Sequence, residues 1–244
     1  MQGIDNNYIS NAIDELVGLL GIKEEISILP THRSLDTRNV KLHIEYIANY
    51  LGLPIVINLS HVPANYQATN AGNRFESNAL AATDRAGRGA QGITAQVSIP
   101  SYLPLYGTAA LQGFPISVKV SYNCLEQRET FVAIMAHELS HIVLHSLLHR
   151  EKDNEYYVDL TAMILGFSEI MLNGRKTVEI RAKSGSTETL TTTYGYLSDE
   201  QFYFAFNKIN EILNRNINLK KMLFEKLTAY RKHLYEVDPI IRTG

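Results

Sequence analysis

The stretch HELSHIVLHSLLH, from His137 to His149, carries a histidine at every fourth position. The residues before it are FVAIMA and its own interior contains IVL, so apolar side chains surround the polar ones. A helix that is apolar on most sides belongs inside a protein rather than on its surface. The sequence therefore predicts a buried helix over roughly residues 127–148, around which the other elements pack.

Outward from this helix, the apolar spacing alternates between the helical and the extended period, which predicts an α+β fold with a small mixed sheet. Further elements are expected as helices over 8–21, 37–51, 154–171 and 198–236, strands over 53–59, 93–99 and 116–122, and a hairpin over 177–196. We predict a core of residues 37–172, an N-terminal helix and connector (1–36), and a C-terminal hairpin and helical extension (173–244). The apolar stripe of the last helix, which includes Phe202 and Ile209, is expected to be core or dimer surface.

His137, Glu138 and His141 form the pattern H-E-x-x-H. Residues four apart lie on one face of a helix, about 6 Å apart along the axis, so the two imidazoles can converge on one metal ion. Glu138 is rotated from them by about 100°, which places its carboxylate beside the metal rather than on it. There it can take a proton from an activated water and pass it to a leaving amine.

A plainer interpretation of the same pattern is a helix with surface histidines and an ordinary glutamate, because H-E-x-x-H also arises by chance. The apolar flanks argue against this interpretation. Burying two histidines and a glutamate costs several kcal/mol unless these groups are paired or bound to a metal. We therefore favour a metal site with His137 and His141 as two of its ligands.

His145 and His149 continue the fourfold spacing but cannot reach the same ion. Along a continuous helix axis they lie about 12 Å and about 18 Å from His137. Nothing in Ile142–Leu144 interrupts the helix. We expect His145 to be a satisfied core histidine or to support a ligand, and His149, beside the charged residues 150–152, to face solvent.

A catalytic zinc ion takes three protein ligands and keeps one open position. The segment NEYYVD supplies Glu155 and Asp159, four residues apart, on a helix that follows a short loop. Glu155 is the predicted third ligand, and Asp159 is placed to accept a hydrogen bond from the outer nitrogen of a ligand histidine. Two alternatives are that Glu155 only caps the helix start and that Glu169, near the helix end, is the ligand instead.

These motifs resemble those of gluzincin-type zinc metallopeptidases, in which H-E-x-x-H is followed by a glutamate ligand and an acid one turn later. HELSHIVLH, the short linker, NEYYVD and the preceding LGLPIVINL are similar, over residues 37–170, to intracellular regulatory peptidases of the ImmA/IrrE kind. The chain also resembles the CapP peptidases of bacterial anti-phage defence operons. It departs from the simplest ImmA-like pattern in its segment 60–115 and in its C-terminal hairpin and helices.

The resemblance implies a zincin-like core, Zn²⁺ as the cofactor, and hydrolysis of a peptide bond in a specific protein substrate such as a transcriptional repressor. Glu138 would be the catalytic base, and a tyrosine or histidine would stabilise the oxyanion. The tyrosine candidates are Tyr156, Tyr157, Tyr194 and Tyr196. The strand over 116–122 is expected to border the cleft, where a substrate could add as a further strand.

Cys124, the one cysteine, lies between the strand over 116–122 and the central helix. One hypothesis is a cysteine switch, in which its thiolate occupies the open position of the zinc as a fourth ligand and holds the enzyme inactive. The likeness to the CapP group implies such latency. The switch requires the chain to fold back over the cleft before the helix starts near Gln127, and the alternative is a small buried thiol.

Composition and charge argue against some classes of partner and cellular location. A formal net charge of −2 does not favour nucleic acid or a membrane surface as a partner. The N-terminus lacks the features of a signal peptide, and one cysteine cannot form an internal disulfide, so we expect a cytoplasmic protein. Gly87, Gly89 and Gly92 match a dinucleotide-binding pattern but precede a strand rather than a helix, which favours a loop.

Two rival functions stay open. A zinc-binding sensor or scaffold would keep the metal and lose nothing when Glu138 is replaced by glutamine. A structural protein with a coincidental H-E-x-x-H would bind no metal. The presence of Glu138 together with Glu155 and Asp159 favours an enzyme, because a scaffold has no need of a general base.

Overall fold

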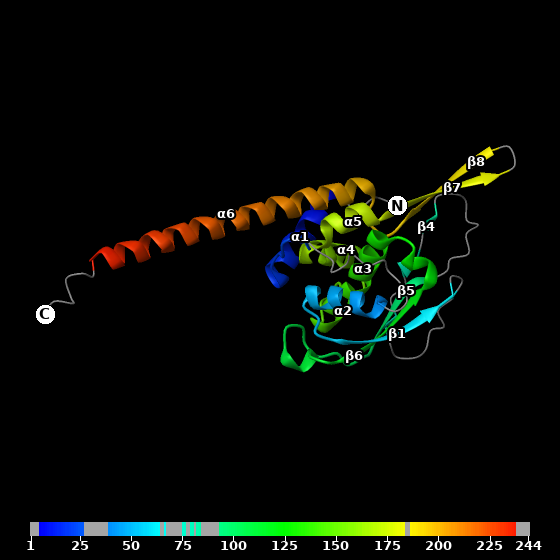
Figure 1. Ribbon diagram of the computed structural model, residues 1–244, viewed down its shortest axis with the longest axis horizontal. Helices are drawn as coiled ribbons and strands as arrows, with labels where there is room; N and C mark the ends of the chain where they lie inside the picture. Colours follow the sequence, from blue (N-terminus) through cyan, green and yellow to red (C-terminus); the bar gives the residue numbers. More distant parts are fainter. Residues whose placement is uncertain are drawn as a thin grey trace.

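The computed structural model shows an α+β protein in which the helices lie on one side of a small mixed sheet (Figure 1). It describes residues 5–26, 39–63, 66, 75–76, 79–80, 82–83, 93–183 and 186–237. The helices are α1 (Asn6–Leu20), α2 (Val40–Leu51), α3 (Arg128–Ser146), α4 (Glu155–Ala162), α5 (Ser168–Gly174) and α6 (Asp199–Val237), with a π-helical turn η3 (Met163–Phe167) and 3₁₀ turns η1 (Ala109–Leu111) and η2 (Tyr122–Leu125). The strands are β1 (Val56–Val62), β2 (Phe75–Glu76), β3 (Ala79–Leu80), β4 (Ala82–Thr83), β5 (Ile93–Ile99), β6 (Pro115–Ser121), β7 (Lys176–Lys183) and β8 (Ser186–Thr193).

β6 is an inner strand of the main sheet. It pairs in parallel with β1 and antiparallel with β5, in the order β1-β6-β5-β2, and β3 also pairs with β5. The expectation that the strand over 116–122 offers an edge to a substrate is therefore wrong, because both edges of β6 are already paired. β1 begins at Val56 rather than at Leu53, because Pro54 has no backbone N–H to donate to the ladder.

α3 is the predicted central helix, and its burial is confirmed. Of its 19 residues, 16 are buried. α2, α4, α5 and β5 all pack against it, so little of its length faces solvent. Apolar side chains such as Phe131, Leu139 and Ile142 are completely buried and hold the polar residues of the same helix in a fixed position.

The prediction of one continuous helix over 154–171 is wrong, because the backbone is interrupted in its middle. α4 runs into the π-helical turn η3, and Gly166 adopts a φ of +94° before α5 begins. A Cβ atom at this position would lie 2.3 Å from the carbonyl oxygen of Glu24. Glycine is therefore required both for the backbone conformation and for the close approach of the segment after α1.

α1 is attached to the core by polar side chains as well as by its apolar face. Glu15 accepts hydrogen bonds from Tyr157 of α4 and from Arg150, each at 3.0 Å. Lys208 of α6 pairs with Asp14 at 2.7 Å. The first and last helices of the described chain thus pack against each other, α1 also packs against α4, and α6 packs against η3.

The two halves of α6 have different surroundings. In the first half, Phe202, Ala205 and Ile209 are buried against the core, which confirms the core interpretation of this apolar stripe. The second half of the helix leaves the body and extends into solvent (Figure 1, orange to red). The β7–β8 hairpin also projects from the body, and β4 pairs with β8.

No helix within the described ranges is long and apolar enough to cross a membrane. The predicted connector over 26–34, apart from Ile26, and the glycine pattern from Gly87 to Gly92 lie outside the described residues.

Candidate metal site

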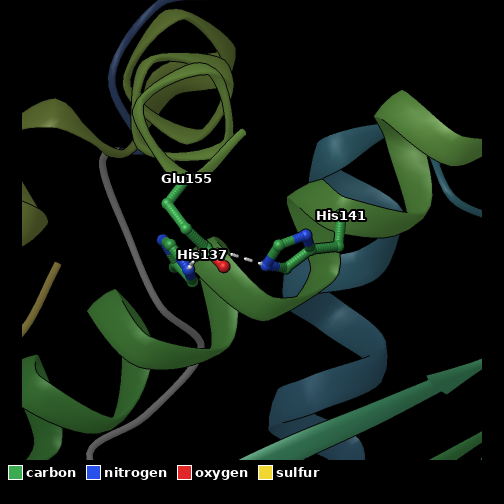
Figure 2. A group of neighbouring side chains, drawn as sticks. All are labelled: His137, His141 and Glu155. Carbon is green, nitrogen blue, oxygen red and sulfur yellow. Dashed lines mark hydrogen bonds and ion pairs between the residues drawn. The ribbon is translucent and has the colours of Figure 1, made fainter. Parts of the chain in front are cut away.

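His137 and His141 extend from one face of α3, and Glu155, at the start of α4, points between them (Figure 2). Oε2 of Glu155 lies 3.1 Å from Nε2 of His137 and 3.3 Å from Nε2 of His141. One ligand atom from each residue lies within 4.8 Å of the other two. These three side chains, called the metal group below, can therefore hold a metal ion.

The turn between α3 and α4 produces this arrangement. After α3 ends at Ser146, Leu148 adopts a left-handed backbone with a φ of 51°, and the chain reverses direction. Asn154 then caps α4, because its side chain accepts a hydrogen bond from the N–H of Tyr156 at 3.1 Å. Asn154 rather than Glu155 is the capping residue, and the Glu155 carboxylate faces α3.

Two of the three distances within the metal group are close to those between the ligands of a tetrahedral ion. Ligand atoms held at about 2.1 Å in a tetrahedron lie about 3.4 Å from one another. The distances from Glu155 to the two histidines, 3.1 Å and 3.3 Å, are close to this edge length. Two imidazole nitrogens and a carboxylate oxygen also form a donor set that zinc accepts. The residues present therefore fit a tetrahedral cation.

The electrostatics of the metal group favour a bound positive charge. Burial alone would lower the pKa of His137, but the carboxylates of Asp159 and Glu155 outweigh burial and raise that pKa well above its usual range. Burial alone would raise the pKa of Glu155, yet its contacts with His137 and His141 lower it to about 2. Glu155 is thus an anion facing two imidazoles, and either protons or a metal cation can neutralise it.

Asp159 holds His137 from the side away from Glu155. Its Oδ1 accepts a hydrogen bond from Nδ1 of His137 at 2.7 Å, which leaves Nε2 to face Glu155. Its Oδ2 accepts hydrogen bonds from the backbone N–H groups of Tyr196 at 2.7 Å and Leu197 at 3.2 Å. One carboxylate therefore joins the metal group to the segment that follows β8.

Two residues that place this segment were not predicted from the sequence. Gly195 has a φ of +88°, and a Cβ atom there would lie 3.1 Å from Oδ2 of Asp159. Arg175 is buried, donates a hydrogen bond to the carbonyl oxygen of Leu197 and lies 3.6 Å from Asp199. The sequence offered one weak signal, a glycine between two aromatic residues immediately before a helix, and it offered none for Arg175.

Tyr196 contacts the metal group through its ring. The ring stacks on that of His137, with centroids 5.7 Å apart and planes inclined by 22°. Burial, followed by the negative charges of Glu155, Glu138 and Asp159, raises the pKa of Tyr196 to about 12. Its phenol therefore stays protonated at neutral pH and is able to donate a hydrogen bond.

The other three tyrosine candidates are engaged elsewhere. The hydroxyl of Tyr157 donates to Glu15 of α1 at 3.0 Å. Burial raises the pKa of Tyr194, whose side chain also has a hydrogen bond with Thr177. Tyr156 is partly buried and packs against the hydrophobic core.

Glu138 is completely buried on α3 and lies beside the metal group without belonging to it. In addition to the effects of burial, its negative charge helps to raise the pKa of both His137 and Tyr196. Its role as the base beside the metal stays a prediction.

Cys124 lies in η2, one turn before α3, and is buried. Burial, and then the charge of Glu138, raises the pKa of its thiol, so the sulfur is protonated at neutral pH. Cys124 is not part of the metal group. Its role as a fourth ligand therefore stays a prediction, which would require both deprotonation and movement toward His137 and His141.

The remaining candidates lie outside the metal group. His145 is largely buried and lies 3.1 Å from Asp153, as expected for a satisfied histidine, and burial lowers its pKa to about 4. The prediction that His149 faces solvent is wrong: it is buried, with Nε2 at 3.4 Å from Glu15, because the turn after α3 packs beneath α1. Glu169 lies on α5, beyond the break at η3.

No family model, curated protein or solved structure matches this chain. The likeness to zinc peptidases is therefore carried by the motif residues and by the spacing between them. Any function assigned to the chain depends on what these residues do together.

Proposed function

We propose that this protein is a zinc-dependent endopeptidase with a zincin-like core. The observation that carries the proposal is the metal group together with two further acids, Asp159 bonded to His137 and Glu138 buried beside it. Burying so many ionisable side chains in one core is costly unless a bound cation and hydrogen bonds compensate. The types and positions of these residues support hydrolysis of a peptide bond.

Zn²⁺ held by His137, His141 and Glu155 would supply the positive charge that activates a water molecule and polarises a peptide carbonyl. Asp159 keeps the proton of His137 on Nδ1, so that Nε2 presents its lone pair to the cation. The Glu138 carboxylate takes a proton from the attacking water and delivers it to the nitrogen of the departing amine.

Tyr196 is the residue that we assign to the developing oxyanion. Its ring is held against His137, and its phenol is protonated at neutral pH. A hydrogen bond from a fixed donor to the carbonyl oxygen becomes stronger as negative charge develops there, and this lowers the barrier. Tyr196→Phe would then reduce kcat by about a hundredfold with zinc content unchanged.

The class of substrate rests on the likeness to ImmA/IrrE- and CapP-type peptidases, whose members cleave a partner repressor. We accordingly propose a regulatory peptidase of the cytoplasm, acting on a specific protein such as a transcriptional repressor. Contact with nucleic acid or membrane is not part of this proposal. A regulatory peptidase has low activity on generic peptides, so casein is a poor test substrate.

The proposal is tested first by metal content and then by cleavage. Elemental mass spectrometry on protein purified without added metal should find about one zinc per chain, both in the wild type and in Glu138→Gln. Each protein is then incubated with the proteins encoded beside its gene, and new N-termini are identified by mass spectrometry. We expect new termini with the wild type only.

Each alternative outcome has a definite meaning. Equal cleavage by the wild type and Glu138→Gln would refute the proposed base. Zinc in both proteins with cleavage by neither would support the sensor or scaffold function. No zinc, and none taken up on titration, would exclude the metal site and with it the enzyme.

A further inference from the structure

The outer half of α6, residues 214–237, plays no part in the proposed chemistry. It projects from the body (Figure 1), and its side chains are described as far as residue 228. Within eleven residues it exposes large apolar side chains, namely Ile217, Leu219, Met222, Leu223, Phe224 and Leu227. Phe224 is 71% exposed and Leu227 is 61% exposed. Apolar surface gathered in this way on a soluble protein marks a binding site.

Three of these residues share one face of the helix with Leu213, whereas Leu219, Met222 and Leu223 lie on its other sides. Leu213, Ile217, Phe224 and Leu227 follow one another at intervals of four, seven and three residues. Side chains at such intervals align on one side, and Lys220 falls in the gap in the middle of this row. We call these five residues the α6 stripe.

The stripe begins in a cleft between α6 and the body, with a volume of about 550 Å³. Ile22, Lys23 and Tyr50 line it from the body, and Leu213, Ile217 and Lys220 line it from α6. Lys23 donates a hydrogen bond to the carbonyl oxygen of Tyr50 at 2.5 Å. Within the described part of the chain, no carboxylate lies within ion-pair distance of Lys23, so the cleft contains a half-buried cation in a mixed wall that also includes Glu24, Asn49 and Asn216.

The surroundings of the stripe are strongly basic. Residues 215–237 contain six lysine or arginine residues and two glutamates, a net charge of +4 in a chain whose net charge is −2. The remainder of the protein is therefore acidic overall. A basic helix with an apolar face is typical of sites that bind either an acidic protein or an anionic membrane surface.

We propose that the α6 stripe and the cleft at its base bind an amphipathic helix that carries acidic side chains, supplied by another protein. The partner's apolar residues would cover Ile217, Phe224 and Leu227, and its carboxylates would pair with Lys220 and Lys23. This surface lies about 30 Å along α6 from Asp199, the end nearest to the metal group. The proposal therefore does not depend on peptidase activity.

Charge decides between this partner and the other two occupants of such a face. In a second copy of the chain the same basic helix would pack against itself, and Lys220 would have no acid opposite it in the interface. On a membrane surface the Lys220 ammonium, in the middle of the apolar row, would be directed toward the acyl chains. An acidic helix satisfies both the apolar row and its central lysine.

The test uses the full-length protein and a synthetic helical peptide. The peptide has leucine at helical spacing on one face and glutamate on its flanks; a matched peptide has lysine in place of each glutamate. We expect the acidic peptide to bind at micromolar concentration, with weaker binding at high salt, and the basic peptide to bind at least about tenfold more weakly. The protein itself should remain monomeric.

Two variants with the same change in charge give the matched control. Lys220 lines the cleft, whereas Lys221 is rotated by about 100° around the helix. We expect Lys220→Glu and Phe224→Ser to weaken binding of the acidic peptide at least about tenfold, and Lys221→Glu to change it less than about threefold. Because these side chains are exposed, none of the variants should affect folding.

The proposal is overturned by any of three results. The first is no binding of the acidic peptide at about 100 μM. The second is a dimer in the wild type that Phe224→Ser dissociates, which would assign the stripe to a second copy of the chain. The third is binding to phosphatidylserine vesicles that Lys220→Glu abolishes while the acidic peptide does not compete.

Discussion

α3 and the outer half of α6 are both helices, but they invert the usual placement of side chains. In α3, the histidines and glutamate of H-E-x-x-H are buried among apolar residues. In the outer half of α6, large apolar residues such as Phe224 are exposed among basic ones. Each helix contains side chains in an environment that is unfavourable for them on their own.

The comparison teaches where to look for function in a chain without matched relatives. A buried polar group needs a partner, and α3 meets this need with Glu155, Asp159 and the cation that the metal group can hold. An exposed apolar row also needs a partner, but the described residues beyond the base of α6 supply none. The buried polar groups of α3 therefore indicate a metal ion inside the protein, and the exposed apolar row of α6 indicates a binding partner outside it.

The largest expected effect is a difference in zinc affinity between two histidine variants of α3. His141→Ala removes one of three ligands, which is worth about 4 kcal/mol, so zinc affinity should fall by about a thousandfold or more. His145→Ala, four residues further along the same helix, removes a histidine that pairs with Asp153 and should leave zinc affinity within about threefold. Competition with a zinc-binding dye measures both. Equal losses would mean that α3 holds no specific metal group.

The next largest expected effect is a difference in the free energy of unfolding between variants in the two halves of α6. Phe202 is 2% exposed and Phe224 is 71% exposed. Phe202→Ala creates a cavity and should lower the free energy of unfolding by about 3–5 kcal/mol. Phe224→Ala should change it by less than about 0.5 kcal/mol. Urea denaturation of both variants gives the values, and a large loss in Phe224→Ala would show that the outer half is covered by this protein itself.

A smaller effect tests whether the segment after β8 supports the metal group. Gly195→Ala and Gly107→Ala both place a side chain at positive φ and should each lower the free energy of unfolding by about 1 kcal/mol. Only the Cβ atom at Gly195 meets a carboxylate, that of Asp159, whereas nothing lies within 4 Å of the one at Gly107. Zinc affinity should fall about tenfold in Gly195→Ala alone. Unchanged zinc affinity would show that Asp159 needs no fixed segment behind it.

The effect that is smallest at neutral pH concerns a buried histidine that is not a ligand. Burial lowers the pKa of His145 from 6.5 to about 4. As the pH falls, the unfolded chain therefore takes up the proton before the folded one does. The contribution of His145 to the free energy of unfolding is fully present above about pH 6.5 and is lost toward pH 4, by at most about 1.4 kcal/mol per pH unit. In metal-free protein, His145→Gln should flatten this part of the stability curve. A parallel curve for the variant would mean that His145 is solvated.

Local periodicity allowed much of this protein to be predicted. The period of 3.6 residues places His137 and His141 on one face whatever surrounds them, and it places Asp159 one turn after Glu155. The hairpin over 177–196 and the helix over 198–236 follow from equally local patterns, and both are present. Each of these features depends on residues close together in the chain.

The incorrect predictions concern features that depend on contacts between residues far apart in the chain. The break at Gly166 depends on the backbone of Glu24, and the burial of His149 depends on α1, which precedes it by more than a hundred residues. The inner position of β6 depends on which strands pair with it. None of these contacts leaves a periodic signal in the sequence, because a contact between distant residues imposes no spacing on either of them.

The sequence by itself determined the buried helix, the paired histidines with their glutamate, and the acids on the helix that follows, because the geometry of one helix relates residues a few positions apart. Only the tertiary structure decided that Glu155 closes the metal group, that Tyr196 rather than another tyrosine lies against His137, and that Cys124 stays outside. Those outcomes depend on how separate elements pack against one another. Side-chain shape, buried charge and the hydrogen bonds to Asp159 control that arrangement.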